Sequence, residues 1–139
     1  MYKDVDYLTS RRMSKIGQSD TKPELVVRKL AHSIGLSYRL NVKDLPGKPD
    51  LANKKKKYAI FVHGCYWHRH TGCKRSSMPT KNIKLWNEKF EKTIQRDKLC
   101  IEKLKAMGYK TLVIWECETQ NLPTLAETLR KFKTHVYDL

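Results

Sequence analysis

A segment near the middle of the chain, residues 58–73 (YAIFVHGCYWHRHTGC), gathers the side chains best able to do chemistry. It opens as an apolar run that reaches His63-Gly64, a pattern typical of a buried strand that ends in a loop. Two of the four cysteines and three of the five histidines lie in this segment, so a metal site or a general base is expected here.

Thiol and imidazole groups in the spacing Cys65-x4-His70-x2-Cys73 form a compact set of candidate zinc ligands. Structural zinc takes four ligands in a tetrahedron, so one more must come from elsewhere in the chain. Cys117, just beyond another apolar run, is the first candidate, and Cys100, within a helical pattern, is its competitor. We expect the ion to fasten the loop to the end of a neighbouring strand and to hold the loop rigidly.

A second chemical centre is predicted around Asp50, which follows the turn-rich residues 43–49 and begins a strand. The basic tip at 54–57 turns this strand into the run that ends at Val62. In an antiparallel hairpin the start of one strand lies beside the end of the next, so Asp50 is expected close to Val62 and His63. A carboxylate and an imidazole at one sheet edge can bind a cation and activate its water.

Two further carboxylates each have alternative explanations. Glu24 lies three residues after Thr21, so it can complete a capping box at the start of a helix, and that role alone would explain it. Asp97 falls on an apolar stripe with helical spacing, and an unpaired buried carboxylate is costly. We therefore expect Asp97 to pair either with an Arg or Lys or with a histidine. The predicted stripe consists of Ile83, Trp86, Phe90, Ile94, Ile101 and Leu104.

Large aromatic side chains lie beside the candidate ligands. Tyr66 and Trp67 are in the loop, and Trp86 is near the start of the following helical pattern. Such residues are most often part of a core. In a strongly basic protein they are alternatively a wedge that unstacks bases, together with Met13 among the cations of the N-terminal segment.

The charge balance points to a polyanionic partner. The chain has 29 Lys and Arg against 14 Asp and Glu, which gives a net charge of +15 and indicates nucleic acid, although an enzyme and a binding module would look alike. No apolar stretch approaches the ~20 residues of a membrane span. The N-terminus has no signal-peptide pattern, so we expect a cytoplasmic protein with reduced thiols.

The order of elements predicts the fold class, an α/β sandwich around a mixed sheet. Residues 1–20 are expected to be a flexible arm that contacts DNA, and residues 21–139 to form one domain. The strand at 110–115 is expected to be central in the sheet. The predicted elements are helix 21–34, strands 36–40, 50–52 and 58–62, helix 83–106, strand 110–115 and helix 123–132.

Taken together, these residues resemble the very short patch repair endonucleases, the Vsr family. The matching segments follow the family's order and cover about residues 10–120. The Pro-Gly-x-Pro-Asp and His-Gly-Cys-aromatic-Trp-His pieces are, in combination, highly specific. The matching segments include Thr21-x-x-Glu24, residues 45–50 (LPGKPD), residues 61–68 (FVHGCYWH), Trp86, Arg96-Asp97 and residues 113–117 (VIWEC).

The resemblance implies a restriction-endonuclease-like three-layer sandwich and a role for each site residue. Asp50 and the backbone carbonyl of Val62 would hold Mg²⁺; Val62 replaces a threonine that we expect in relatives, a change that a carbonyl ligand tolerates. His63 and His68 would lie beside the scissile phosphate, with His68 as the general base. Asp97 would orient that histidine. Glu24 would be a further acidic residue of the site.

The resemblance also assigns the zinc ligands and the DNA wedge. The gap between His70 and Cys73 is one residue longer than we expect for the family, so His68 is the alternative to His70 as the histidine ligand. The zinc ligands would be Cys65, His70, Cys73 and Cys117. The wedge residues would be Met13, Tyr66, Trp67 and Trp86.

The activity implied by the resemblance is strand-specific nicking of duplex DNA, on the 5′ side of the mismatched thymine in a T·G pair that arises from deamination of 5-methylcytosine. One alternative is a restriction-like nuclease of the same fold with another specificity. The other is a zinc-stapled DNA-binding module without catalysis. We expect a monomer that acts on chromosomal DNA in a bacterial cytoplasm, with no membrane partner and with mismatch-repair proteins as candidate partners.

Overall fold

The protein, seen in a computed structural model, is described for residues 21–137. The expected arm 1–20 and its Met13 lie outside the described residues. The predicted order of helices and strands is confirmed, with one addition, a short 3₁₀ helix after the last strand. The elements are α2 (Lys22–Ser33), β1 (Arg39–Leu40), β2 (Leu51–Asn53), β3 (Tyr58–His63), α3 (Ile83–Ala106), β4 (Lys110–Trp115), η2 (Glu116–Gln120) and α4 (Leu122–Tyr137).

The four strands form one mixed sheet in the order β1-β2-β3-β4. β2 and β3 form the predicted antiparallel hairpin, with Leu51 opposite Ile60, and β4 runs parallel to β3. The prediction that residues 110–115 form a central strand is wrong, because β4 is the last strand of the described sheet. Its apolar sequence reflects helices packed on its two faces rather than strands paired at both edges.

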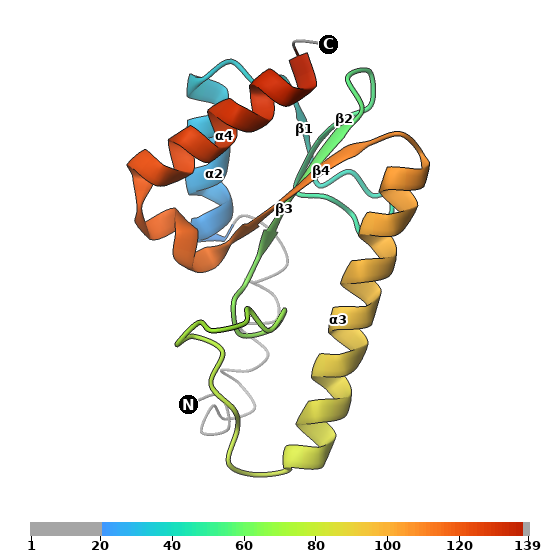
Figure 1. Ribbon diagram of the computed structural model, residues 1–139, viewed down its shortest axis with the longest axis vertical. Coiled ribbons are helices and arrows are strands. Elements are labelled where there is room, and N and C mark those ends of the chain that lie inside the picture. The colour runs from blue at the N-terminus through green and yellow to red at the C-terminus, as the bar shows by residue number, and fades with distance from the viewer. Residues whose placement is uncertain (1–20, 138–139) are drawn as a thin grey trace.

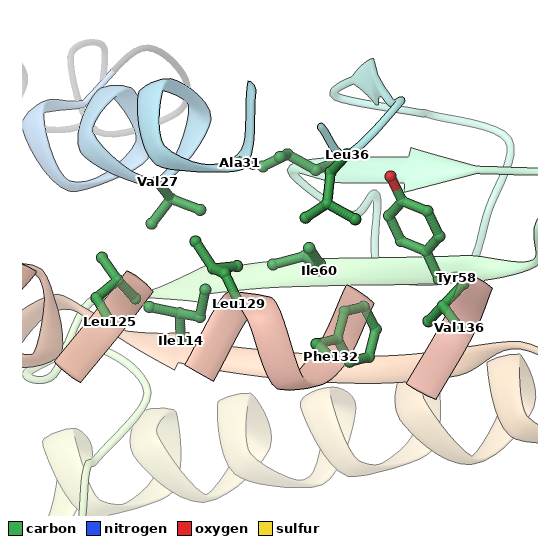
Figure 2. Packing of buried hydrophobic residues seen from close by; sticks show 11 residues of the cluster. Val27, Ala31, Leu36, Tyr58, Ile60, Ile114, Leu125, Leu129, Phe132 and Val136 are labelled. Atoms are coloured by element: carbon green, nitrogen blue, oxygen red, sulfur yellow. The ribbon is translucent and has the colours of Figure 1, made fainter. Parts of the chain in front are cut away.

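Helices cover both faces of this sheet, α2 and α4 on one side and α3 on the other (Figure 1). Side chains alternate along β3, so Tyr58 and Ile60 enter the core beneath α2 and α4, while Ala59 and Phe61 enter the core beneath α3. The first core is the larger and is shown in Figure 2. Its members include Val27 and Ala31 of α2, Ile114 of β4, and Leu125, Leu129, Phe132 and Val136 of α4.

Helix α2 begins with the predicted capping box. Thr21 accepts a hydrogen bond from the Glu24 backbone N–H, and the Glu24 carboxylate accepts one from the Thr21 backbone N–H at 3.1 Å. Gly35 follows the helix with φ of +88°, a conformation that suits glycine after a helix end. Because this box fixes the first turn, it also fixes the position of the Glu24 carboxylate, which is buried.

Helix α3 extends past the sheet. Its 24 residues make it about 36 Å long, whereas six-residue β3 and β4 span only about 20 Å. The N-terminal half therefore lies beside the segment 64–82 instead of beside strands (Figure 1). This explains why the prediction of a continuous buried stripe is wrong for Ile83 and Ile94, which are 51% and 46% exposed, and right for Phe90 and Leu104.

Candidate active site and metal centre

Asp50 directly precedes β2 and lies beside the end of β3, as the hairpin predicts. Its Oδ2 accepts a 2.6 Å hydrogen bond from the backbone N–H of Val62, near the end of β3. Burial raises the pKa of Asp50 to about 7; the Val62 N–H lowers it and the nearby Glu24 carboxyl raises it. A half-buried carboxylate with a raised pKa and an acidic neighbour is a favourable site for a cation, which would displace the proton.

Glu24 therefore belongs to two arrangements at once. It caps α2, and its carboxyl interacts with that of Asp50 from the neighbouring layer. Arg28, one turn further along α2, has its Nη2 3.7 Å from Glu24 Oε2. This guanidinium partly offsets the negative charge that two close carboxylates would otherwise carry.

The three histidines of residues 58–73 divide between two places, and the first place is beside Asp97. His68 Nδ1 lies 2.5 Å from Asp97 Oδ2 on α3, so the partner of this carboxylate is a histidine rather than an Arg or Lys. The His63 ring stacks on the His68 ring with centroids 4.0 Å apart and planes 6° from parallel. Burial lowers the pKa of His63 to about 4, helped by the nearby His68 and opposed by Asp97.

The second place is a cluster of three cysteines and one histidine. The ligand atoms of Cys65, His70, Cys73 and Cys117 all lie within 4.8 Å of one another, as do those of His63, His68 and Asp97 in their own group. His70 Nδ1 is 3.7 Å from Cys65 Sγ and 3.4 Å from Cys117 Sγ. The other candidate, Cys100, lies instead against Gly47 in the loop before β2.

The donors of the cysteine cluster fit zinc by their chemistry. Three thiols and one imidazole are a common structural zinc set, and their atoms converge from the end of β3, the following loop and the end of β4. Burial raises the pKa of Cys65 to about 12. Thiolates in such a place need a cation to stabilise them, which favours a bound metal over three neutral thiols. The identity of the ion stays a prediction.

The large aromatic residues Tyr66, Trp67 and Trp86 form one cluster with Phe90. Tyr66 meets Trp67 and Phe90 edge-on at 5.3 Å and 5.5 Å, and Trp67 lies 6.1 Å from Trp86. Phe90 is buried, but the other three are only half-buried. They thus pack as a small core and still present ring surface to solvent, and the role of Tyr66, Trp67 and Trp86 as a wedge stays a prediction.

Arg69 was not identified from the sequence. Its guanidinium lies 4.1 Å from the Phe90 ring centroid and donates hydrogen bonds to the backbone carbonyls of Tyr66, Ser76 and Ser77. It therefore joins the loop after β3 to the segment 74–82 and to α3. In a chain with 29 Lys and Arg, nothing in the sequence distinguishes this one cation from the surface cations.

Trp115, the last residue of β4, was also missed as a site residue. Its ring stacks on His70 at 4.3 Å and meets His63 edge-on at 5.3 Å. The signal that could have found it is the parallel register, which pairs Trp115 with His63. That register follows only once residues 110–115 are known to lie next to β3.

The fold and the two clusters first define a class: a mixed α/β protein with two candidate metal-binding groups at the carboxyl ends of two neighbouring parallel strands. Among the described residues, no helix has the length and apolarity of a membrane span. The family model described as DNA mismatch endonuclease Vsr matches residues 6–75. The chain belongs to the Vsr family.

Three relatives match this chain over most of their length. The chain is 40% identical over 118 residues to the type II nicking enzyme V.XorIIP of Xanthomonas oryzae pv. oryzae, which covers 85% of this chain and 86% of that protein. It is 38% identical over 135 residues to the type II nicking enzyme V.NmeAIP of Neisseria meningitidis, a match that covers 95% of this chain and 96% of that protein. It is 33% identical over 118 residues to the DNA mismatch endonuclease Vsr of Escherichia coli, a match that covers 85% of this chain and 75% of that protein.

Proposed function

We propose that this protein is a strand-specific nicking endonuclease that hydrolyses the phosphodiester on the 5′ side of the mismatched thymine in T·G pairs. Family membership supports a DNA endonuclease of mismatch repair, and three relatives carry the words nicking enzyme or mismatch endonuclease in their names. The net charge of +15 supports a polyanionic substrate. T·G pairs that arise from deaminated 5-methylcytosine are the proposed lesion.

The observation that carries the proposal is the contact between His68 and Asp97. It is linked to the Asp50–Val62 hydrogen bond through His63, which follows Val62 in β3 and stacks on His68. A carboxylate only accepts hydrogen bonds, so Asp97 fixes the tautomer in which His68 Nδ1 carries the proton. His68 Nε2 is then the basic nitrogen. A base oriented in this way near a cation-binding carboxylate is what hydrolysis of a phosphodiester requires.

The oxygen donors at the strand ends fit Mg²⁺. The residues proposed to hold the ion are Asp50, through its carboxylate, and Val62, through its backbone carbonyl, with Glu24 as a further acidic residue. When bound, the cation neutralises charge that develops on the phosphate and lowers the pKa of a water molecule. His68 takes the proton from the attacking water, and the buried, neutral His63 supports the His68 ring by stacking.

The wedge proposal concerns the aromatic cluster. We assign Tyr66, Trp67 and Trp86 to contacts with bases beside the mismatch, because their side chains are only half-buried. Trp67 directly precedes His68 and lies 6.1 Å from Trp86. A mismatched pair unstacks at lower cost than a Watson–Crick pair, which would favour insertion there. Met13 belongs to the same proposal, together with an N-terminal arm, residues 1–20, that grips DNA. The fold is proposed to be a restriction-endonuclease-like sandwich, since α2 and α4 face α3 across a mixed sheet (Figure 1).

The test uses a duplex in which each strand carries a different label. In Mg²⁺ the wild type should cut only the strand with the mismatched thymine, and Asp50→Ala should not cut. Equal cutting of a fully paired duplex would favour a restriction-like nuclease. Binding without cutting by the wild type would favour a zinc-stapled binding module. Unchanged cutting by Asp50→Ala would refute the proposed site.

A further inference from the structure

Trp115 lies between the two candidate metal-binding groups. It ends β4 opposite His63, the last residue of β3, in the parallel ladder. One ring neighbour is His70 of the cysteine cluster, stacked with planes 9° from parallel. Another is His63, met edge-on with an interplanar angle of 74°. The indole therefore contacts one imidazole from each group.

The contacts continue from His63 to α3. The His63 ring stacks on His68, whose Nδ1 is held by Asp97. The rings of His70, Trp115, His63 and His68 thus form an unbroken series from the cysteine cluster to the carboxylate that orients the general base. A planar ring stacked on a fixed neighbour has its tilt restricted, so each ring in the series limits the next.

The position of Trp115 is itself well fixed. Its backbone N–H donates a 2.9 Å hydrogen bond to Glu118 Oε1, and Cys117 follows two residues later within the metal cluster. The side chain is half-buried and belongs to neither of the two hydrophobic cores. Its large aromatic surface therefore contacts the two histidines instead of packing beneath a helix.

We propose that Trp115 is a positioning residue, which transmits the rigidity of the Cys65–His70–Cys73–Cys117 cluster to the His63–His68 pair. The inference rests on the proposed nuclease function. Displacement of a catalytic base by about 1 Å costs about 100-fold in rate, so a small tilt of His68 is enough to matter. The zinc site then has a second purpose, because it holds a ring against the active site as well as closing a loop.

The first test compares Trp115→Leu, which keeps apolar bulk, with Trp115→Phe, which keeps a ring. Zinc content, single-turnover nicking rate and KM for a T·G duplex are measured for both. We expect Trp115→Leu to keep one zinc and to lose about 10- to 100-fold in rate with KM within about threefold of the wild type. Trp115→Phe should retain most of the rate. Phe132→Leu, in the core on the other side of the sheet, controls for general destabilisation.

Three results would overturn the proposal. The first is a Trp115→Leu protein with zinc bound and a rate within about twofold of the wild type. The second is an equal loss of rate in Trp115→Leu and Trp115→Phe. The third is an equal loss in the Phe132→Leu control. If Trp115→Leu fails to hold zinc, the same comparison is made between Trp115→Phe and the wild type, where a rate below one tenth would overturn the role of the ring.

A second variant separates the ring of His70 from its ligand atom. His70→Cys offers four thiolates, a set that also suits structural zinc, but removes the ring on which Trp115 stacks. We expect this variant to retain zinc and to lose rate. Trp115→Leu should then cost less in the His70→Cys background than in the wild type, because both changes break the same series of contacts. Strictly additive losses would overturn the coupling.

An NMR measurement tests the coupling without activity. His70→Cys should shift the imidazole signals of His63 and His68 when Trp115 is present and should leave them unchanged in Trp115→Leu. Equal shifts in both backgrounds would overturn the proposal. If the wild type fails to nick a T·G duplex, the proposed function is wrong, while these shifts still decide whether Trp115 couples the two groups.

Discussion

The backbone N–H of Val62 donates a 2.6 Å hydrogen bond to Oδ2 of Asp50, and this contact closes the open end of the β2–β3 hairpin. It holds a carboxylate where burial raises its pKa to about 7, far above the ordinary value of 3.8. At the ends of these two strands the folded protein therefore holds a carboxylate whose negative charge costs free energy. Such a cost is common where a site is built for a ligand rather than for stability.

Asp50→Asn should stabilise the protein in magnesium-free buffer. Because the folded state raises the pKa of Asp50, it favours the protonated carboxyl, and stability from this group is lost as pH rises from about 4 to about 7. The neutral amide can still accept the Val62 hydrogen bond. We expect a gain of about 1–3 kcal/mol in the free energy of unfolding at pH 8, a small gain at pH 4, and loss of nicking. Urea titrations at both pH values measure this, and an equal effect at both would contradict it.

His63→Gln should remove a pH dependence of the opposite sign. The folded state lowers the pKa of His63 from 6.5 to about 4, so it favours the neutral ring, and stability from this group is lost as pH falls from about 6.5 to about 4. Unfolding free energies of His63→Gln should therefore fall less steeply on acidification than those of the wild type. The exposed His32→Gln is the matched control. If the free energy of unfolding of His63→Gln depends on pH as steeply as that of the wild type, folding does not lower the pKa of His63.

Asp97→Asn should lower the nicking rate with little effect on DNA binding. The amide can donate to His68 Nδ1, which favours the tautomer with the proton on Nε2 and so removes the base. We expect the single-turnover rate to fall by about 100- to 10,000-fold. Glu102→Gln changes an exposed carboxylate on the same helix and should leave the rate unchanged. Comparable rates for the two variants would exclude Asp97 from the site.

Cys117→Ser and Cys100→Ser should differ in their metal content. Cys117 Sγ lies 3.4 Å from His70 Nδ1, whereas Cys100 lies against Gly47 and outside the cluster. We expect Cys100→Ser to keep one zinc. Cys117→Ser should lose it and melt about 5–10 °C lower, because metal binding contributes directly to the folded state. Elemental analysis and thermal melting measure both effects, and zinc retained by Cys117→Ser would contradict the ligand assignment.

Much of the site follows from local sequence rules, and the remainder depends on packing. The capping box fixed the place of Glu24, and hairpin geometry predicted that Asp50 would lie beside Val62. Periodicity put Asp97 on the inner stripe of its helix but did not choose its partner, because His68 reaches it from a loop without regular structure. The sequence therefore predicted a histidine partner for Asp97 only as one of two alternatives, the other being an Arg or Lys.

Other features were beyond local rules for distinct physical reasons. An apolar run such as residues 110–115 shows that both faces of a strand are covered, but not whether both edges are paired, so β4 was misplaced at the centre. Ile83 and Ile94 match the helical period of a buried stripe. They are nevertheless exposed, because α3 extends past the end of the sheet. The contacts of Trp115 depend on a strand register that pairs it with His63, which lies 52 residues earlier in the chain.

Arg69→Met should loosen the loop that carries Tyr66 and weaken discrimination of the mismatch. The change deletes hydrogen bonds to the carbonyls of Tyr66, Ser76 and Ser77 while keeping an apolar chain against Phe90. Buried or half-buried carbonyls without donors favour local opening. We expect the ratio of nicking rates on T·G and T·A duplexes to fall by about 10-fold, with zinc retained.

Arg69→Lys and Arg130→Met separate geometry from charge. Lysine keeps the cation of Arg69 but cannot present a planar fork to several carbonyls at once, so Arg69→Lys should be nearly as impaired as Arg69→Met. Arg130→Met removes an exposed cation from α4 and should leave the ratio unchanged. Limited proteolysis within residues 74–82 reports opening directly, since Arg69 holds this segment through Ser76 and Ser77. If Arg69→Met and Arg130→Met behave alike in both measurements, Arg69 acts only as one of many positive charges, and the loop is held by other contacts.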